Sequence, residues 1–569
     1  MISIVDGAVN VSISGSRETL LKIQDHFKWR PNRFYMDPRY IIWKKTMERE
    51  LAEGRPLSNV GWDGWKRPGK LLKSGKLVMG RGWTPLIVDL AEIEGWPVDL
   101  SGMIENPFKD LQPDEIPDEV IAGSRHLEQW ELQKNCVAAL MRAGCGRVKV
   151  TVSGGKTAIL CSVAALIKAY RPEKRILYIT PNERLVSQSS VEARKFLPHW
   201  DVGQYGGAER QLDAKDLVVA TSAILNTNLE KLVKAKWFDS FAGILCDECQ
   251  FSASKSQQKI LTACRAWFRV GVSDTTKEGD PYKNAILTGS FGPVLNETIE
   301  AGDLIEMGQI AKPTIRVVKF QSHTGVYNEL NHMPEEGSPG WALSDGKWIN
   351  GNYAGPAYEL NKDGDFQLDK AGNPVAIPGT CYFEDKDGNV QLMETKWCLL
   401  ERKFDRSIIR FKPRNEYIQQ RCLEWQQAGL RTLVIVTRTV HVKLLEAELS
   451  KVCDMSKVRI LYGVHTLKER DEAFSWIKET AGAVLVSPLV KIGTSINEIE
   501  RGIVADFVAD HELANQFVGR FIRKKFKGSN TAEIIWFHDV QHRSYGAVSN
   551  KVIRYLKSID GYEFDEDII

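Results

Sequence analysis

Long apolar runs, a cysteine framework and an excess of one charge are all absent from this chain of 569 residues. No stretch approaches the ~18 apolar residues that a membrane-spanning helix needs, so we expect no membrane partner. The first residues lack the basic and apolar regions of a secretory signal, and the ten cysteines show no regular spacing. These absences exclude membrane proteins and disulfide-stapled secreted proteins, and they predict a cytoplasmic location with reduced thiols.

The small net charge, +3 from 76 Lys and Arg against 73 Asp and Glu, conceals an uneven distribution. Residues 1–81 carry 16 basic and 8 acidic side chains, whereas residues 82–120 carry one basic and ten acidic side chains. The basic stretch is also rich in aromatic residues, and cations beside stacking rings are typical of nucleic-acid binding.

We therefore expect a small α+β DNA-binding domain over residues 1–100, followed by an acidic linker over residues 101–124. The candidate DNA contacts in this domain are Trp62, Trp65, Lys66 and Arg67. The alternative is a small module whose aromatic residues form its core and whose cations are only solvated.

From about residue 125, short apolar runs alternate with helical stretches, a pattern that predicts a parallel α/β sheet. The runs are 147–151, 175–180, 217–220 and 243–246. The first leads into Ser153-Gly-Gly-Lys-Thr157 and an apolar helix over 158–170. Glycines let backbone N–H groups close around phosphate oxygens at a helix N-terminus, so Lys156 would reach the β- and γ-phosphates and Thr157 would bind Mg²⁺. Because the full pattern requires Gly where Val150 stands, a plain tight turn is the alternative.

A second candidate component is the acidic pair Asp247 and Glu248, which ends the apolar run 243–246. Asp247 can hold Mg²⁺ through water, and Glu248 can orient or deprotonate an attacking water. The pair lies between Cys246 and Cys249, but a zinc site would need a second cysteine pair, and the sequence has none at a suitable spacing. In the order observed, these motifs predict ATP hydrolysis with Mg²⁺.

A third component is the segment Gln516-Phe-Val-Gly-Arg520-Phe-Ile-Arg523. Arginines three residues apart share one face of a helix, and an arginine can stabilise the charge that develops on a γ-phosphate. The alternative is a basic helix terminus that binds phosphate backbone or solvent.

Taken in order, the motifs over residues 125–540 resemble those of the superfamily 2 helicases and translocases. This resemblance implies two RecA-like parallel-sheet lobes, at 125–311 and 312–569, with ATP hydrolysed in the cleft between them. It further implies catalytic roles for Lys156, Asp247, Glu248, Gln516, Arg520 and Arg523. It assigns ATP binding to Gln133, Ser153, Gly154, Gly155, Lys156, Thr157 and Ala158, coupling to Gln250, Ser273, Thr275 and Gly493, and DNA contacts to Pro181, Arg184, Thr221, Arg438, Ser487 and Thr494.

The front of the chain is similar to that of phage UvsW-type branch-migration helicases, in Phe34-Tyr-Met-Asp-Pro-Arg39 and Trp62-Asp-Gly64. This second resemblance implies action on forks, displacement loops and four-way junctions, in recombination, repair or replication. The partners would be branched, single- and double-stranded DNA, together with replication or recombination proteins. A phage-encoded protein would act in the host cytoplasm.

Two positions depart from the superfamily pattern: Gln250 stands where His is usual, and Asp274 stands where Ala is usual. Neither change removes the phosphate lysine or the catalytic acids. Two alternatives stay within the ATPase class, a double-strand DNA translocase and an RNA helicase, and a third is a non-catalytic junction-binding protein. The segment 322–403 lies outside the resemblance, and Asp-Gly pairs between its alternating runs predict a β-rich insertion of hairpins.

Overall fold

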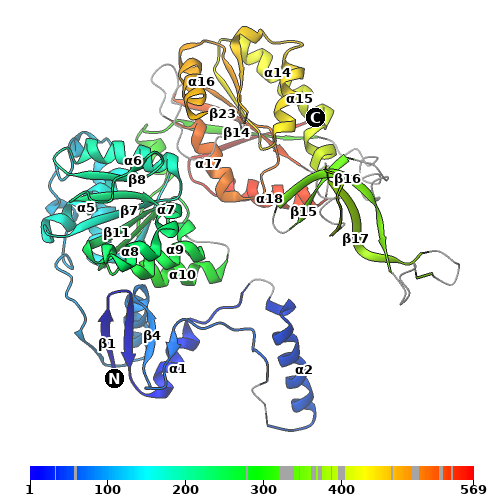
Figure 1. Ribbon diagram of the computed structural model, residues 1–569. Helices are drawn as coiled ribbons and strands as arrows, with labels where there is room; N and C mark the ends of the chain where they lie inside the picture. The colour runs from blue at the N-terminus through cyan, green and yellow to red at the C-terminus, as the bar shows by residue number, and fades with distance from the viewer. Residues whose placement is uncertain are drawn as a thin grey trace. The chain divides into compact units, whose positions relative to one another are not determined.

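The computed structural model describes residues 1–31, 34–56, 60–276, 280–320, 339–344, 347–359, 367–368, 374–385, 387–394, 404–462, 465–487, 499–523, 530–539 and 543–569. The chain divides into two compact units, Met1–Gln309 and Ile310–Ile569 (Figure 1). Across these ranges, no helix is both long and apolar enough to cross a bilayer.

The first unit begins with a small α+β module whose sheet has the strand order β3-β4-β2-β1-β5. Its strands are β1 (Ile2–Gly7), β2 (Asn10–Ser14), β3 (Lys70–Leu71), β4 (Leu77–Gly80) and β5 (Val98–Gly102), and its helices are α1 (Arg17–His26), α2 (Pro38–Ala52) and α3 (Thr84–Ile93). Ile2, Ile4, Val11 and Ile13 alternate along β1 and β2 and are fully buried beneath α1 and α3. The module therefore has an aliphatic core of its own.

Helix α2 stands apart from this sheet as an arm (Figure 1). Asp37 caps its N-terminus by accepting from the Arg39 N–H (2.9 Å), and Pro38 occupies the first turn. Apolar side chains along the arm stay in solvent, with Ile42 51% and Leu51 66% exposed. A helix that forms without burying its apolar face presents a surface for contact with another molecule.

The larger part of the first unit is a parallel sheet, the first lobe, with the order β13-β6-β12-β11-β7-β10-β8-β9. Its strands are β6 (Cys145–Val150), β7 (Arg175–Thr180), β8 (Val202–Gly206), β9 (Glu209–Arg210), β10 (Leu217–Thr221), β11 (Phe241–Asp247), β12 (Phe268–Ser273) and β13 (Val294–Ile299). Its helices are α4 (Trp130–Ala143), α5 (Lys156–Tyr170), α6 (Glu183–Phe196), α7 (Ser222–Thr227), α8 (Leu229–Lys234), α9 (Lys255–Ala263), α10 (Pro281–Phe291) and α11 (Ala301–Glu306). The predicted strands and the helix after the phosphate-loop sequence agree with these bounds to within a few residues.

The acidic segment over 101–124 packs against the first lobe and is not an extended tether. Ile116 and Ile121 are each 1% exposed, and the Ala122 N–H donates to the Phe196 carbonyl oxygen (2.7 Å). Lys134 of α4 forms an ion pair with Asp118. We expected a linker because this segment is acidic and contains prolines, but its few apolar residues pack against the lobe.

The module joins the first lobe through a buried network around Arg81. The Arg81 guanidinium lies 3.4 Å from the Asp6 carboxylate, with the two side chains 5% and 2% exposed. It also donates to the Trp267 carbonyl oxygen (2.6 Å) and covers the Trp267 ring at 4.1 Å, while Trp267 Nε1 donates to Asp6 (3.2 Å). At Gly82, a Cβ would lie 1.9 Å from the Thr288 carbonyl oxygen, so the two backbones meet without side chains between them.

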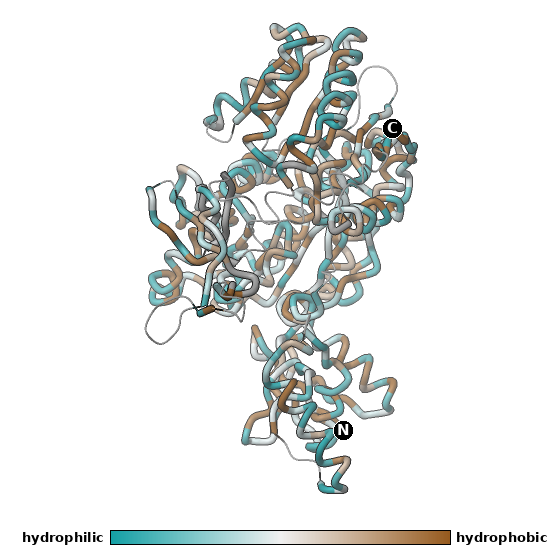
Figure 2. The backbone as a smooth tube through the Cα atoms, turned by 90° about the vertical axis from the view of Figure 1, so that its right-hand side faces the viewer, coloured by the Kyte–Doolittle hydropathy of each residue, from teal (hydrophilic) through white to brown (hydrophobic). Residues whose placement is uncertain are grey.

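The second unit contains another parallel sheet, the second lobe, with the order β20-β21-β19-β22-β23-β14-β24. Its strands are β14 (Lys312–Lys319), β19 (Thr432–Ile435), β20 (Val458–Ile460), β21 (Val484–Ser487), β22 (Arg501–Val504), β23 (Thr531–His538) and β24 (Glu563–Ile568). Its helices are α14 (Lys412–Gln427), α15 (Thr439–Leu449), α16 (Leu467–Glu479), α17 (His511–Phe521) and α18 (Arg543–Lys557). In both lobes, apolar residues concentrate along the strands (Figure 2).

The insertion of the second unit is β-rich, as its sequence predicts, with the antiparallel order β15-β16-β17-β18. Its strands are β15 (Pro339–Ser344), β16 (Lys347–Tyr358), β17 (Ala376–Asp385) and β18 (Val390–Glu394). The turn at Asp387-Gly388 is built by Asp385, whose carboxylate accepts from the N–H groups of Asp387 (2.9 Å) and Asn389 (2.8 Å). The other two predicted turns, at 345–346 and 363–364, lie outside the described residues.

Asp6→Ala is expected to lower the free energy of unfolding of the first unit by about 3 kcal/mol, because it leaves the Arg81 guanidinium buried without its carboxylate. Calorimetric unfolding of the full chain measures the change. Glu18→Ala is the control, because Glu18 pairs with Lys22 in solvent and its removal should leave the transition unmoved. Equal behaviour of the two variants would contradict a stabilising role for the Arg81 network.

Candidate functional site

The loop between β6 and α5 has the shape of a phosphate cradle. Ser153 (φ 72°) and Gly155 (φ 83°) both adopt the left-handed conformation, which turns successive N–H groups toward the start of α5. Gln133 of α4 stabilises this loop conformation because its Nε2 donates to the Gly154 carbonyl oxygen (3.1 Å). A Cβ on Gly155 would lie 2.0 Å from Gln133 Nε2, so only glycine fits there.

Two buried polar atoms at this loop find no hydrogen-bond partner among the residues that the structure describes. They are Oε1 of Gln133 and the Ser153 hydroxyl. Burying an unsatisfied polar atom costs on the order of 1–3 kcal/mol, and such atoms mark places where a ligand supplies the missing bond. Their location on the predicted ATP-binding segment fits a nucleotide.

Lys156 and Glu248 form a largely buried ion pair, with Nζ and Oε1 2.9 Å apart. Glu248 has φ 49°, a strained value that places its carboxylate at the carboxyl end of β11, beside the first turn of α5. Burial lowers the pKa of Lys156, but the carboxylates of Glu248, Asp274 and Asp247 outweigh it, so that this pKa stands above its ordinary value. Lys156 is therefore charged across the physiological range.

Gln250 links Glu248 to the neighbouring strand β12. Its Nε2 donates to Glu248 Oε2 (3.1 Å), and its Oε1 accepts from the Ser273 hydroxyl (2.6 Å). The Ser273 oxygen in turn accepts from the Thr275 N–H (2.9 Å). Because an amide carries both a donor and an acceptor, glutamine bridges here where the superfamily usually has histidine.

Asp247 ends β11 in a partly buried position. Burial and the adjacent Glu248 carboxylate raise its pKa well above the ordinary value, against the lowering effect of Lys156. Asp274, which is 4% exposed, adds a third acid near the same lysine. Asp247 and the Thr157 hydroxyl in the first turn of α5 carry oxygen donors of the kind that Mg²⁺ prefers.

Three predicted DNA contacts of the first lobe also follow its strands, since Pro181 and Arg184 come after β7 and Thr221 ends β10. Parallel neighbours place these ends at one edge of the sheet, the edge that also carries Asp247 and Ser273. Thr221 is 1% exposed and its hydroxyl caps α7 by accepting from the Ile224 N–H (3.3 Å). Its side chain therefore has a structural role as the N-terminal cap of α7.

In the second lobe, Asp506 fixes the backbone that presents Arg438, a role absent from the sequence-based expectations. Its carboxylate accepts from the Thr437 hydroxyl (2.7 Å) and from the N–H groups of Thr437 and Arg438, and it pairs with His441. Burial would raise the pKa of Asp506, but these partners hold it below its ordinary value. Asp506 follows β22, Ser487 ends β21 and Arg438 follows β19. Because β21 and β22 both pair with β19 in parallel, these three residues lie at one edge of the sheet.

The arginine motif of the second lobe differs from its predicted geometry. Gln516 and Arg520 lie on α17, but this helix ends at Phe521. Arg523 lies beyond the helix, where it pairs with Ile310 in an isolated antiparallel bridge. The expectation of one shared helix face was therefore wrong for Arg523. Gly493 and Thr494, predicted for coupling and DNA contact, lie outside the described residues.

Of the four predicted DNA contacts of the module, three already make contacts within it, and Lys66 contacts the first lobe. Arg30 covers the Trp65 ring at 4.4 Å, Arg39 covers Trp62 at 5.3 Å, and Trp62 Nε1 donates to the Trp65 carbonyl oxygen (2.6 Å). Arg67 pairs with Asp25 (2.6 Å) and Asp63 (3.2 Å), and Lys66 lies over the Tyr282 ring at 5.0 Å. These contacts order the base of the arm, whose exposed cations are Lys44, Lys45 and Arg49 of α2.

Asp247→Asn should raise the midpoint of thermal unfolding of the ligand-free protein at pH 8, on the order of a few degrees. The wild-type carboxylate is buried and ionised at that pH, whereas the amide is neutral. The gain should shrink as pH falls toward 5, because a carboxyl with a raised pKa becomes protonated in the folded state. Unfolding scans in a chelator at both pH values measure the difference, and a gain independent of pH would contradict the raised pKa.

The first lobe matches the model of the family described as "Type III restriction enzyme, res subunit" over residues 127–278. A search of curated protein sequences returned no match. Among solved structures, a fragment described as an HsdR subunit of a type I restriction enzyme from Vibrio vulnificus YJ016 is 15% identical, with 93% of this chain and 96% of that chain covered at a TM-score of 0.50. This likeness shows the fold.

Two further structures are similar at lower TM-scores. T4 UvsW is 15% identical, with 100% of this chain and 99% of that chain covered at a TM-score of 0.39. Dbp5 of S. cerevisiae, bound to RNA and ADP BeF3, is 10% identical, with 82% of this chain and 96% of that chain covered at a TM-score of 0.47. The family match on the first lobe and the parallel sheets in both units agree with the fold that the resemblance to superfamily 2 helicases implies.

Proposed function

We propose that this enzyme is an ATP-dependent DNA helicase or translocase that acts on branched DNA such as forks, displacement loops and four-way junctions. The observation that carries the motor part is the unbroken chain from Lys156 through Glu248 and Gln250 to Ser273. It runs across the ends of adjacent strands, from the phosphate loop to the segment that follows β12. A change at the nucleotide can therefore alter the hydrogen bonds at the strand ends where we expect nucleic acid to bind.

The chain's own residues would share the work of hydrolysis as follows. Lys156 would exchange Glu248 for phosphate oxygens, and the released Glu248 carboxylate would orient and deprotonate the attacking water. Thr157 and Asp247 would hold Mg²⁺, which would supply positive charge to the phosphates. Arg520 and Arg523 are proposed to stabilise the charge on the γ-phosphate, with Gln516 on the same segment.

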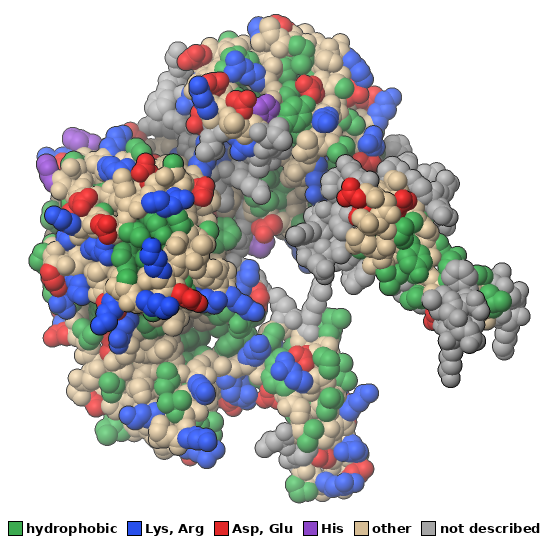
Figure 3. Space-filling model, viewed as in Figure 1, with side chains coloured by type: hydrophobic (Ala, Val, Ile, Leu, Met, Phe, Trp, Pro, Cys, Tyr) green, Lys and Arg blue, Asp and Glu red, His purple; other side chains and the backbone are tan. Residues whose placement is uncertain are grey.

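The DNA-selecting part is assigned to the module and its arm. Lys and Arg side chains gather on the module and along α2 (Figure 3), beside exposed apolar residues such as Tyr35 (60%) and Met36 (61%). Cations bind phosphates on either strand, and exposed rings and apolar tips can stack at an unpaired branch point. Pro181, Arg184, Arg438 and Ser487 are proposed as backbone contacts along the strand being moved.

Two alternatives fit the observations less well. Gln250 and Asp274 favour a non-catalytic junction-binding protein, but Gln250 still forms hydrogen bonds with both Glu248 and Ser273, which supports the motor. A double-strand DNA translocase or an RNA helicase without junction preference would not require the exposed cations and apolar residues of the arm. The experiments below separate these alternatives.

ATP turnover should depend on Lys156 and should rise most with branched DNA. We expect Lys156→Ala to lower turnover by at least about 100-fold, since it removes the cation that holds the β- and γ-phosphates. Turnover is measured without nucleic acid and with single strands, RNA and a four-way junction. Absence of any Lys156-dependent turnover would overturn the motor, and equal stimulation by RNA would favour the RNA alternative.

Gln250→Ala should reduce DNA-stimulated turnover about tenfold while leaving basal ATP affinity within about twofold, because it cuts the link between Glu248 and Ser273. Gln250→His, which restores a donor and an acceptor, should retain most of the stimulation. The ratio of stimulated to basal turnover is the measurement. Full stimulation in Gln250→Ala would show that coupling does not run through this residue.

Replacing Lys44, Lys45 and Arg49 of α2 by Gln should weaken junction binding about tenfold at low salt, since three phosphate contacts are lost. Turnover stimulated by single strands should change little. The matched control replaces Lys70, Lys73 and Lys76, exposed cations of the same module outside the arm. An equal loss in both variants would assign binding to the overall charge of the module and contradict a specific role for the arm.

A further inference from the structure

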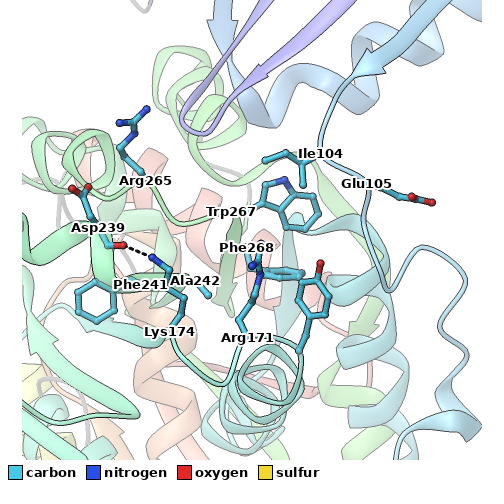
Figure 4. Close-up of a pocket in the computed structure, with 11 residues that line it drawn as sticks. Ile104, Glu105, Arg171, Lys174, Asp239, Phe241, Ala242, Arg265, Trp267 and Phe268 are labelled. Carbon is cyan, nitrogen blue, oxygen red and sulfur yellow. Dashed lines mark hydrogen bonds between the residues drawn. The ribbon is translucent and has the colours of Figure 1, made fainter.

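A second concave site lies at the opposite end of the first lobe from the phosphate loop (Figure 4). Its volume is about 350 Å³. Phe241 and Phe268 line it at the starts of β11 and β12, whereas Asp247 and Ser273 stand at the ends of the same strands. Strands of this length separate the two sites by about 20 Å.

The aromatic side chains that line this pocket are fixed by contacts with neighbouring residues. Phe108 packs edge-on against both Tyr170 (5.8 Å) and Phe268 (5.9 Å), and Trp267 packs edge-on against Phe268 (4.6 Å). Arg81 covers the Trp267 ring, and Asp6 accepts from its indole N–H. Tyr170 is 44% exposed and Arg171 lies over its ring at 5.3 Å, so a flat group can stack on the part of the ring that Arg171 leaves open. Rings fixed in this way lose little entropy when a flat group stacks on them.

The charged side chains of the pocket come in two sets. Arg171, Lys174 and Arg265 supply cations, of which Lys174 donates to the Asp239 carbonyl oxygen (2.8 Å) and Arg171 lies 3.7 Å from the exposed Glu173. Exposed ion pairs such as that one are weak, so Arg171 can exchange its partner for a stronger anion. The acids are Glu105 and Asp239, and their carboxylates can accept from amino groups.

We propose that this pocket binds a nucleotide, with its base against Tyr170 and Trp267 and its phosphate against Arg171 and Arg265. A purely apolar ligand would form no ion pair with the three cations, and a simple anion would not stack on the rings. The nucleotide can be free in solution or can belong to a DNA strand, and the chemistry of recognition is the same. Because Trp267 also contacts Asp6 and Arg81, occupancy would act on the joint between the module and the first lobe.

Photo-crosslinking of the full chain tests this site. One probe is 8-azido-ATP, and the other is a single-stranded oligonucleotide carrying 4-thiothymidine. Mass spectrometry then locates the modified residues. We expect saturable labelling at Tyr170 or Trp267 in addition to any labelling near Lys156, and the probe that labels the pocket identifies the source of the nucleotide. No labelling of the pocket by either probe would overturn the proposal.

The double variant Arg171→Glu with Arg265→Glu should lower labelling of the pocket at least tenfold. Labelling near Lys156 in the same sample should persist, which reports that the lobe is folded and makes the result independent of the phosphate loop. The matched control, Lys195→Glu with Lys259→Glu, makes the same charge change at exposed positions on α6 and α9 and should leave labelling unchanged. Undiminished labelling in the first variant, or an equal loss in the control, would overturn the proposal.

Discussion

The candidate ATPase site depends on the buried pairing of Lys156 with Glu248. Opposite charges 2.9 Å apart in a poorly solvated setting attract strongly, and neither is stable there alone. In the proposed mechanism, phosphate groups would compete with Glu248 for Lys156, and Glu248 is also bonded to Gln250 and through it to Ser273. The same exchange would free the proposed water-activating acid and alter its bonds to the neighbouring strand, which would give one physical origin for hydrolysis and for coupling.

A second constraint is the rigid attachment of the module to the first lobe. Asp6, Arg81 and Trp267 bond to one another in a nearly water-free contact, and Gly82 lets the two backbones approach closely. DNA held by the module and the arm would therefore move as one body with the first lobe during the ATP cycle. The proposed nucleotide pocket shares Trp267 with this contact, so it lies where a ligand could alter the attachment.

Several of the acidic side chains that keep the net charge near zero are paired with cations within each unit. Asp118 of the acidic segment pairs with Lys134 in the first lobe. In the second lobe, the acidic C-terminal stretch is the edge strand β24, and its Glu563 and Glu566 pair with Lys312 and Lys319 of β14 at 2.6 Å each. Exposed cations of the arm, such as Lys45 and Arg49, are then available for the proposed contact with DNA.

The sequence by itself predicted the alternating strands, the phosphate loop, Asp247 with Glu248 and the β-rich insertion, because these depend on local periodicity and on short motifs. Only the tertiary structure decided that Arg67 is neutralised by Asp25 and Asp63 and that Asp506 holds the backbone at Arg438. Likewise, it alone decided that Arg523 lies past its helix and that the acidic segments pack as ordered elements. Each of these depends on partners distant in the chain, whose approach is set by strand order and packing and leaves no local pattern.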